Sequence, residues 1–138
     1  MKEKRRIIYA YMLESHPSTE VLAMGITRAT ITLMGEKESD VELIVDTGSI
    51  LTWVNRGTLE RIGVKPRWEK DFRTIEGRTI KRKTGLVAIR HDGTGAGIEV
   101  VFGGRNDAEV LGVTALEGLG IEIDPVTRAL KRTSLLAL

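Results

Sequence analysis

The chain has 138 residues, of which 29% are charged and 41% hydrophobic, and a formal net charge of +2, as expected of a single globular domain with its own core. It contains no cysteine, which excludes disulfides, thiolate catalysis and cysteine-ligated zinc. No apolar run reaches the ~18 residues that span a bilayer, so we expect a cytoplasmic protein with no membrane partner.

Residues 1–20 are expected to form an N-terminal arm or first strand, and residues 21–138 the domain itself. Apolar residues there mostly recur with the period of two that is typical of β-strands. In chain order, strands are expected at 28–34, 41–45, 50–54, 86–89, 98–102 and 121–123. Two short helices are expected at 56–62, with Asn55 as N-cap, and at 113–119, ended by Gly120. The pattern predicts a mostly-β fold: a small closed or partly closed β-barrel with one or two short helices.

One tetrapeptide, Asp46-Thr47-Gly48-Ser49, lies between two apolar strands. An aspartate that follows a buried strand and enters a Thr-Gly turn is how aspartic proteases hold the carboxylate that activates water. The tripeptide Asp46-Thr47-Gly48 alone is weak evidence, but a later Val110-Leu111-Gly112 directly before the second predicted helix strengthens the interpretation. A second near match, Asp92-Gly93-Thr94-Gly95, has no buried strand before it and is interpreted as a hairpin turn.

Peptide hydrolysis by carboxylates needs two of them within about 3 Å, sharing one proton, because two like charges cannot both ionise at that distance. The sequence offers one suitable residue, Asp46. The second carboxylate must therefore come from another copy of the chain. A two-fold axis between two Asp46 side chains meets this need, because an isologous interface places identical residues face to face.

These residues resemble a known family, the retropepsin-like (retroviral-type) aspartic proteases, over roughly residues 25–130. The resemblance is carried by Asp46-Thr47-Gly48-Ser49, Ile75-Glu76-Gly77-Arg78, and Val110-Leu111-Gly112 with Leu116. It implies an acid-protease-type barrel with a flap hairpin, functional as a homodimer that cuts polypeptides without a cofactor.

The resemblance also implies a role for each residue of the turn. Asp46 would be the catalytic carboxylate, and Thr47 would hydrogen-bond across the dimer axis. Gly48 would let the substrate backbone approach closely, because it has no β-carbon. The Ser49 hydroxyl would reach the Asp46 carboxylate and lower its pKa.

Away from the turn, Ile75-Glu76-Gly77-Arg78 would form the tip of the flap over the substrate. Leu111 and Gly112 would lie under the Asp46 turn, with Gly112 starting the helix. The sequence departs from viral members at Ile50 and Val113, where those members commonly place an acid and an arginine that pair. Here an apolar contact is expected to replace the ion pair, a change that can be neutral or stabilising.

Positive charge is concentrated in residues 65–90, which hold nine basic and three acidic side chains. Such a segment on a nearly neutral protein favours an acidic partner or substrate, here a peptide rich in Asp or Glu. A solvated basic hairpin is the alternative interpretation.

Three other functions were weighed. His16 and His91 have no ligand-spaced partners, so no metal site is expected. A catalytically silent dimer of the same fold, binding extended peptides as a scaffold, is the alternative to the protease. A small nucleic-acid-binding barrel would interleave aromatic residues with the basic ones. Phe72 is the only aromatic residue in 70–90, so no nucleic-acid partner is expected.

Overall fold

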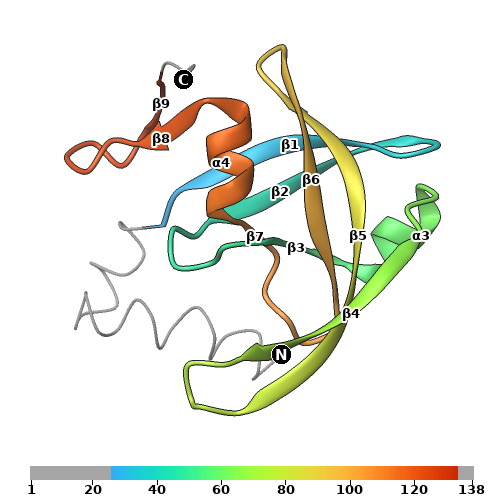
Figure 1. Ribbon diagram of the computed structural model, residues 1–138. Helices are drawn as coiled ribbons and strands as arrows, with labels where there is room; N and C mark the ends of the chain where they lie inside the picture. The colour runs from blue at the N-terminus through green and yellow to red at the C-terminus, as the bar shows by residue number, and fades with distance from the viewer. Residues whose placement is uncertain (1–25, 134–138) are drawn as a thin grey trace, which may run out of the picture.

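The computed structural model describes residues 26–133, and the arm predicted at residues 1–20 lies outside them. The strands are β1 (Arg28–Met34), β2 (Glu38–Val45), β3 (Thr52–Asn55), β4 (Pro66–Arg73), β5 (Thr79–His91), β6 (Thr94–Gly103), β7 (Val110–Leu111), β8 (Ile121–Ile123) and β9 (Leu130–Arg132). The helices are α3 (Arg56–Arg61) and α4 (Val113–Leu119). The prediction of a mostly-β fold with two short helices is confirmed (Figure 1).

Six strands close into a ring. The main sheet has the order β1-β2-β7-β3-β6-β5-β4, and β1 also pairs with β5, so the sheet returns to its first strand. The strand β4 pairs with β5 outside this ring, and β8 and β9 form a separate two-stranded sheet. Ring closure brings Asp46, which follows β2, onto the same sheet as the hairpin of β4 and β5.

The core fills the inside of the ring. Alternate residues of β1 face inward, so Ala29, Ile31 and Leu33 are buried while their neighbours are more exposed. The helix α4 packs on β6 and buries Leu116 and Leu119. The largest fully buried apolar side chains are Ile31, Leu33, Leu43, Leu59, Ile62, Ile89, Leu111 and Leu119. Each such side chain contributes roughly 1.5–3 kcal/mol by leaving water.

Local sequence features set the ends of several elements as predicted. The Asn55 side chain accepts a hydrogen bond from the Gly57 backbone N–H at 2.8 Å and caps α3. Gly120 ends α4 in the left-handed conformation, with φ of 66°. Asp92 and Gly93 both have positive φ, which a two-residue turn between β5 and β6 requires. The near match at Asp92 is therefore a hairpin turn, as predicted.

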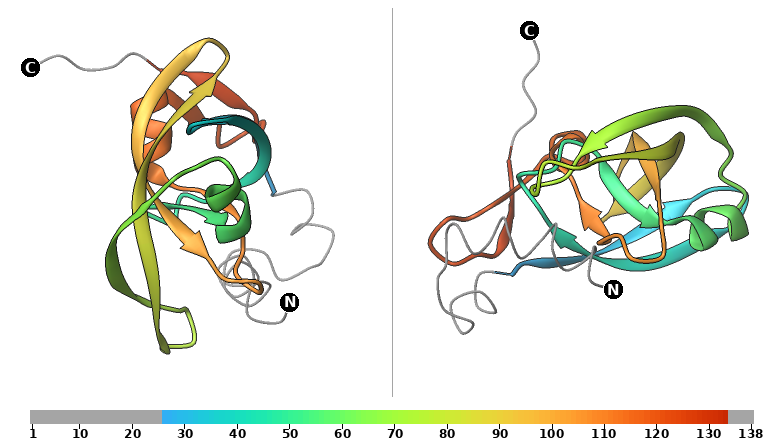
Figure 2. Two further views of the ribbon diagram at one scale, coloured as in Figure 1. Left: turned by 90° about the vertical axis from the view of Figure 1, so that its right-hand side faces the viewer. Right: turned by 90° about the horizontal axis from the view of Figure 1, so that it is seen from below.

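The hairpin of β4 and β5 extends away from the ring, and its tip lies at the bottom of Figure 1. The first half of β5 pairs with β4, and its second half pairs with β6 and β1. Figure 2 shows the same hairpin from two further sides. This one strand joins the extended hairpin to the core.

Candidate active site

The Asp46 turn begins directly where β2 ends. Val45 pairs in parallel with Leu111 of β7, and the next backbone N–H, that of Asp46, donates to the Leu111 carbonyl oxygen at 3.0 Å. The Ser49 N–H donates back to the Asp46 carbonyl oxygen at 3.1 Å and closes the turn. The buried strand and its neighbour β7 therefore fix the backbone of Asp46 from both sides.

The Asp46 carboxylate is half-buried and held by one backbone donor. The Gly48 N–H donates to its Oδ1 at 2.9 Å. Burial raises the pKa of Asp46 above its ordinary value of 3.8, and the Gly48 hydrogen bond opposes this without cancelling it. Even in a single chain, the site favours the protonated carboxyl more than water does.

Ser49 differs from the sequence-based expectation. Its hydroxyl donates to the Leu51 carbonyl oxygen at 2.6 Å, and not to the Asp46 carboxylate. A serine hydroxyl has a single hydrogen to donate, so this bond leaves none for Asp46. The donor that lowers the pKa of Asp46 is the Gly48 backbone N–H instead.

The start of α4 lies against the strand that leaves the turn. The Gly112 N–H donates to the buried Thr52 hydroxyl oxygen at 3.0 Å, and the Val113 N–H donates to the Ser49 carbonyl oxygen at 2.8 Å. The Thr114 N–H donates to the Ile50 carbonyl oxygen at 3.1 Å. Three successive residues of the helix start thus support the backbone beside Asp46.

Gly112→Ala is expected to destabilise the fold and distort the Asp46 turn. An alanine β-carbon would overlap the Leu51 carbonyl oxygen, and it would lie 2.6 Å from the Leu51 carbonyl carbon. Overpacking of this kind costs about 1–3 kcal/mol, measured as the free energy of unfolding in urea. Gly97→Ala is the matched control, because a β-carbon there meets no atom within 4 Å. Equal stability of the two variants would contradict this close packing.

A cavity of about 530 Å³ lies between the Asp46 turn and the hairpin of β4 and β5. Of the predicted site residues, those that line it are Asp46, Gly48, Ser49 and Ile75. The predicted residues that do not line it are Thr47, Glu76, Gly77, Arg78, Leu111 and Gly112. The structure therefore brings the predicted carboxylate and one residue of the predicted flap tip to the same cavity.

The tip of the hairpin is a compact turn. The Thr74 N–H donates to the Arg78 carbonyl oxygen at 2.8 Å, and the Gly77 N–H donates to the Thr74 carbonyl oxygen at 2.9 Å. The Thr74 hydroxyl oxygen accepts from the Arg78 N–H at 3.1 Å. Gly77 has a φ of 88°, which disfavours other residues there. Ile75, whose side chain is 43% exposed, is the apolar residue of this tip at the cavity.

Two aromatic residues form part of the cavity wall. Trp53 of β3 and Phe72 of β4 contact edge to face, with ring centroids 4.9 Å apart. Sequence analysis singled out neither ring as part of the site. The alternation of β3, with Thr52 and Val54 buried, places Trp53 on the opposite face, toward the cavity.

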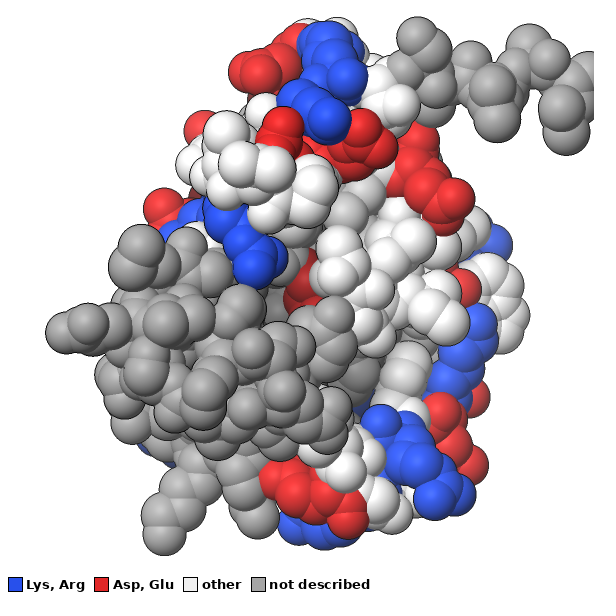
Figure 3. Space-filling model, turned by 90° about the vertical axis from the view of Figure 1, so that its left-hand side faces the viewer, with Lys and Arg blue, Asp and Glu red and all other residues white. Residues whose placement is uncertain are grey.

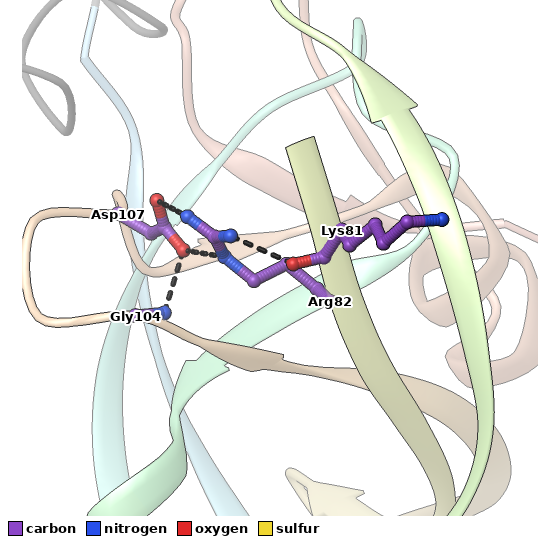
Figure 4. A network of polar contacts seen from close by, with 4 residues as sticks. All are labelled: Lys81, Arg82, Gly104 and Asp107. Carbon is purple, nitrogen blue, oxygen red and sulfur yellow. Dashed lines mark hydrogen bonds and ion pairs between the residues drawn. The ribbon is translucent and has the colours of Figure 1, made fainter. Parts of the chain in front are cut away.

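An arginine on β5 binds the loop that follows β6 (Figure 4). Arg82 Nε donates to Asp107 Oδ2 at 2.6 Å, and its terminal nitrogen donates to Oδ1 at 3.0 Å. The Gly104 N–H also donates to Asp107 Oδ2, and the Asp107 side chain is only 1% exposed. The next residue, Ala108, lines the cavity, so this contact positions one wall. Sequence analysis missed the pair.

Ion pairs reduce the charge of the basic segment. Lys81 pairs with Asp71 at 3.0 Å and Arg90 with Glu38 at 3.4 Å. Lys70 and Arg82 also have acidic partners, Glu99 and Asp107. On the face in Figure 3, basic and acidic side chains lie beside one another around uncharged surface. The net field is therefore weaker than the sequence count suggests.

Residues 26–133 offer neither a metal-binding cluster nor a membrane-spanning helix. In this part of the chain, no three side chains of the types His, Cys, Asp or Glu come together as ligands for a metal ion. No helix there is long and apolar enough to cross a membrane. The cavity itself offers carboxylates, ammonium and guanidinium groups, hydroxyls and apolar surface as its chemistry.

Two of the solved structures that resemble this chain in fold are proteases. No family model and no curated protein matches the sequence. The solution structure of Simian Foamy Virus (mac) protease is 18% identical, has a TM-score of 0.49, and the match covers 65% of this chain and 91% of that one. The crystal structure of a retropepsin-like aspartic protease from Rickettsia conorii is 17% identical, has a TM-score of 0.47, and the match covers 72% and 84%. The second structure has the name of the family that the sequence resembles, retropepsin-like aspartic protease.

Proposed function

We propose that the chain is an aspartic endopeptidase that works as a homodimer, with one Asp46 from each subunit. The observation that supports this best is the position of Asp46. Its half-buried carboxylate lines a cavity below a hairpin, next to a backbone donor and largely apolar side chains. Hydrolysis of a peptide bond by carboxylates needs one in such a place, together with a second one.

The mechanism uses two Asp46 carboxyl groups that share one proton. The ionised group takes a proton from a bound water, which attacks the scissile carbonyl carbon. The protonated group donates its proton to the carbonyl oxygen, and a tetrahedral gem-diol forms. The carboxyl group that took the water proton then gives it to the leaving nitrogen, while the other carboxylate takes a proton from a gem-diol hydroxyl, and the C–N bond breaks. The raised pKa of Asp46 supports this proposal, because one of the two groups must keep its proton.

The residues around Asp46 have supporting roles in this proposal. Thr47 would bind across the two-fold axis, and Gly48 would let the substrate backbone come close. Ile50 directly follows the turn, and its side chain is 71% exposed in a single chain. In the proposed dimer, the partner subunit would cover this side chain. The tip, 74–78, would close over the peptide.

The proposal is tested by hydrolysis of a mixed peptide library at several protein concentrations. Specific activity should rise with concentration and reach a plateau once sedimentation shows only dimers. Full specific activity at concentrations where the chain is monomeric would overturn the shared site. The alternative, a silent scaffold, predicts peptide binding by the dimer without any cleavage.

Ser49→Ala is expected to leave the pH optimum of hydrolysis where it is in the wild type. The Ser49 hydroxyl donates to Leu51 and not to the carboxylate, so its removal takes no hydrogen bond from Asp46. The measurement is kcat/KM against pH for both proteins, whose two limbs belong to the pair of carboxyl groups. An optimum that moves to higher pH would show that Ser49 turns toward Asp46 in the working dimer.

A preference for acidic peptides remains a prediction and concerns positions near the cut. Arg73 lines the cavity directly before the flap tip, and an acidic substrate side chain close to it would gain a charge-assisted hydrogen bond. Because Arg73 is exposed, the advantage should weaken as salt exceeds about 0.15 M, where the Debye length is ~8 Å. Cleavage of the library at low and high salt measures it. An equal yield from acidic and neutral peptides at low salt would contradict it.

A further inference from the structure

A charged pair lies in the wall of the otherwise largely apolar cavity. Lys70 of β4 and Glu99 of β6 both line it, and Lys70 Nζ is 2.5 Å from Glu99 Oε2. The Lys70 side chain is 45% exposed and that of Glu99 is 21% exposed. Neither residue was singled out as a site residue by sequence analysis, because they are far apart in the chain and on different strands.

The pair lies at a distance from the Asp46 turn. Starting from β2, which leads into Asp46, the neighbours across the sheet are β7, β3 and then β6, which carries Glu99. Measured along the curved sheet, three strand spacings are about 14 Å, and β6 lies across the ring from β2. Glu99 also lines a second, smaller hollow of about 420 Å³, on Leu86, Ala88 and Gly97. Glu99 is thus shared by both hollows, on a strand that lies across the ring from the strand leading into Asp46.

The two charged groups still have hydrogen-bonding capacity. Glu99 Oε2 is buried and lies 2.5 Å from Lys70 Nζ, so the other carboxylate oxygen is the one left to accept from a ligand. Burial acts to raise the pKa of Glu99, but contacts with Lys70 and Thr84 outweigh it and lower the pKa. Glu99 is thus a carboxylate at neutral pH, next to an ammonium group with further N–H donors.

We propose that the Lys70–Glu99 pair is a specificity-determining element that selects a substrate side chain carrying an amide, glutamine or asparagine, several residues from the scissile bond. An amide can donate to Glu99 and accept from Lys70 at the same time. A carboxylate on the substrate would attract Lys70 but repel Glu99, and an ammonium group would do the reverse. The inference rests on the proposed function, because it concerns the substrate of the same cavity.

The experiment uses three sets of peptides and two variants that unbalance the pair. Each peptide set carries Gln, Glu or Lys at one position, which is moved in turn through five residues on either side of the cut. Glu99→Gln leaves the Lys70 ammonium group without a counter-charge. Lys70→Met leaves the Glu99 carboxylate without a counter-charge. Lys81→Met is the matched control, because its pair with Asp71 likewise links β4 to another strand, β5, but does not line the cavity. Urea unfolding shows that each variant is folded.

At one position the wild type should cleave the Gln peptide about tenfold better than the Glu and Lys peptides. Glu99→Gln should change this preference to Glu, and Lys70→Met should change it to Lys, each by about tenfold, the usual weight of one charge-assisted hydrogen bond. The control should keep the wild-type preference. Cleavage with the same preference in all four proteins would overturn the inference and leave the proposed function standing.

Binding of the same peptides to Asp46→Asn proteins separates the two proposals. Asp46→Asn is used alone and combined with Glu99→Gln or Lys70→Met, so that the peptide preferences of the three can be compared. If the preferences reverse in binding but the wild type cleaves nothing, the inference stands and the proposed function is wrong. If the peptides are neither cleaved nor bound, both are wrong. Reversal in both measurements supports both.

Discussion

Replacing Asp46 by asparagine is expected to abolish peptide hydrolysis, with a loss of at least about 10⁴-fold in kcat. An amide can neither take a proton from water nor share one with the partner carboxyl group. The fold should remain intact, because the asparagine side chain keeps an oxygen that can accept from the Gly48 N–H. Cleavage of a fluorogenic peptide measures the loss. Activity within tenfold of the wild type would remove Asp46 from the mechanism.

The same variant should be at least as stable as the wild type at neutral pH. The folded-state pKa of Asp46 is raised above 3.8, so the folded chain holds this proton more tightly than the unfolded chain. Stability then falls as pH rises from the unfolded pKa through the folded one, and asparagine lacks this penalty. Well below pH 3.8 the difference should vanish. Urea unfolding at acid and neutral pH measures the stability difference between the variant and the wild type. A variant that is less stable than the wild type only at neutral pH would contradict the raised pKa of Asp46.

Mixing subunits tests whether both carboxylates are needed. When excess Asp46→Asn chains exchange into wild-type dimers, activity per wild-type chain should fall in proportion to the wild-type fraction. Asp71→Asn chains are the matched control, since Asp71 is exposed and does not line the cavity. These chains keep their own Asp46, so activity per total chain should stay unchanged at every mixing ratio. Constant activity in the first mixture would mean that one carboxylate is enough.

Arg82→Met is expected to cost about 3–5 kcal/mol of unfolding free energy, because it leaves the Asp107 charge buried without its partner. Lys81→Met on the same strand is the matched control. Both side chains of its pair with Asp71 are exposed, so little change in unfolding free energy is expected. Denaturation in urea measures both variants. An Arg82 variant no less stable than the Lys81 variant would show that the buried pair contributes nothing.

The double variant Arg82→Met/Asp107→Asn should recover part of this loss. Asparagine carries no charge and keeps an oxygen for the Gly104 N–H. If burial of an unpaired charge causes the loss, the double variant is more stable than Arg82→Met alone. A further loss on adding Asp107→Asn would instead assign the cost to packing of the arginine.

Features that depend on nearby residues were predictable. The Asn55 cap, the glycine that ends α4 and the strand before Asp46 follow from short patterns, and the structure agrees with them. The strand β4 was not predicted, because nearly all of its residues are exposed and no buried alternation marks it. The predicted acceptor of the Ser49 hydroxyl, the Asp46 carboxylate, was wrong. The Leu51 carbonyl oxygen lies similarly near along the chain, and the sequence does not show which of the two acceptors is preferred.

Contacts between distant residues were not predictable. Lys70 and Glu99 are on strands that meet only after the hairpin of β4 and β5 has formed and β6 has returned beside it. Arg82 and Asp107 are 25 positions apart, and the sequence gives only a basic strand and a polar loop. The cavity wall likewise combines β3, β4, β5, β6 and β7. Such partners are set by ring closure and not by local pattern.

The edge position of β4 has a consequence for solubility. Of the strands in the main sheet, β4 pairs with only one neighbour among the described residues, so one side of its backbone is open to other chains. It begins with Pro66 and carries charges of both signs at five of its eight positions, Arg67, Glu69, Lys70, Asp71 and Arg73. Proline and charge on an open edge oppose the edge-to-edge pairing that leads to aggregation. Proline and the charges on β4 therefore help to keep copies of the chain from aggregating through this edge.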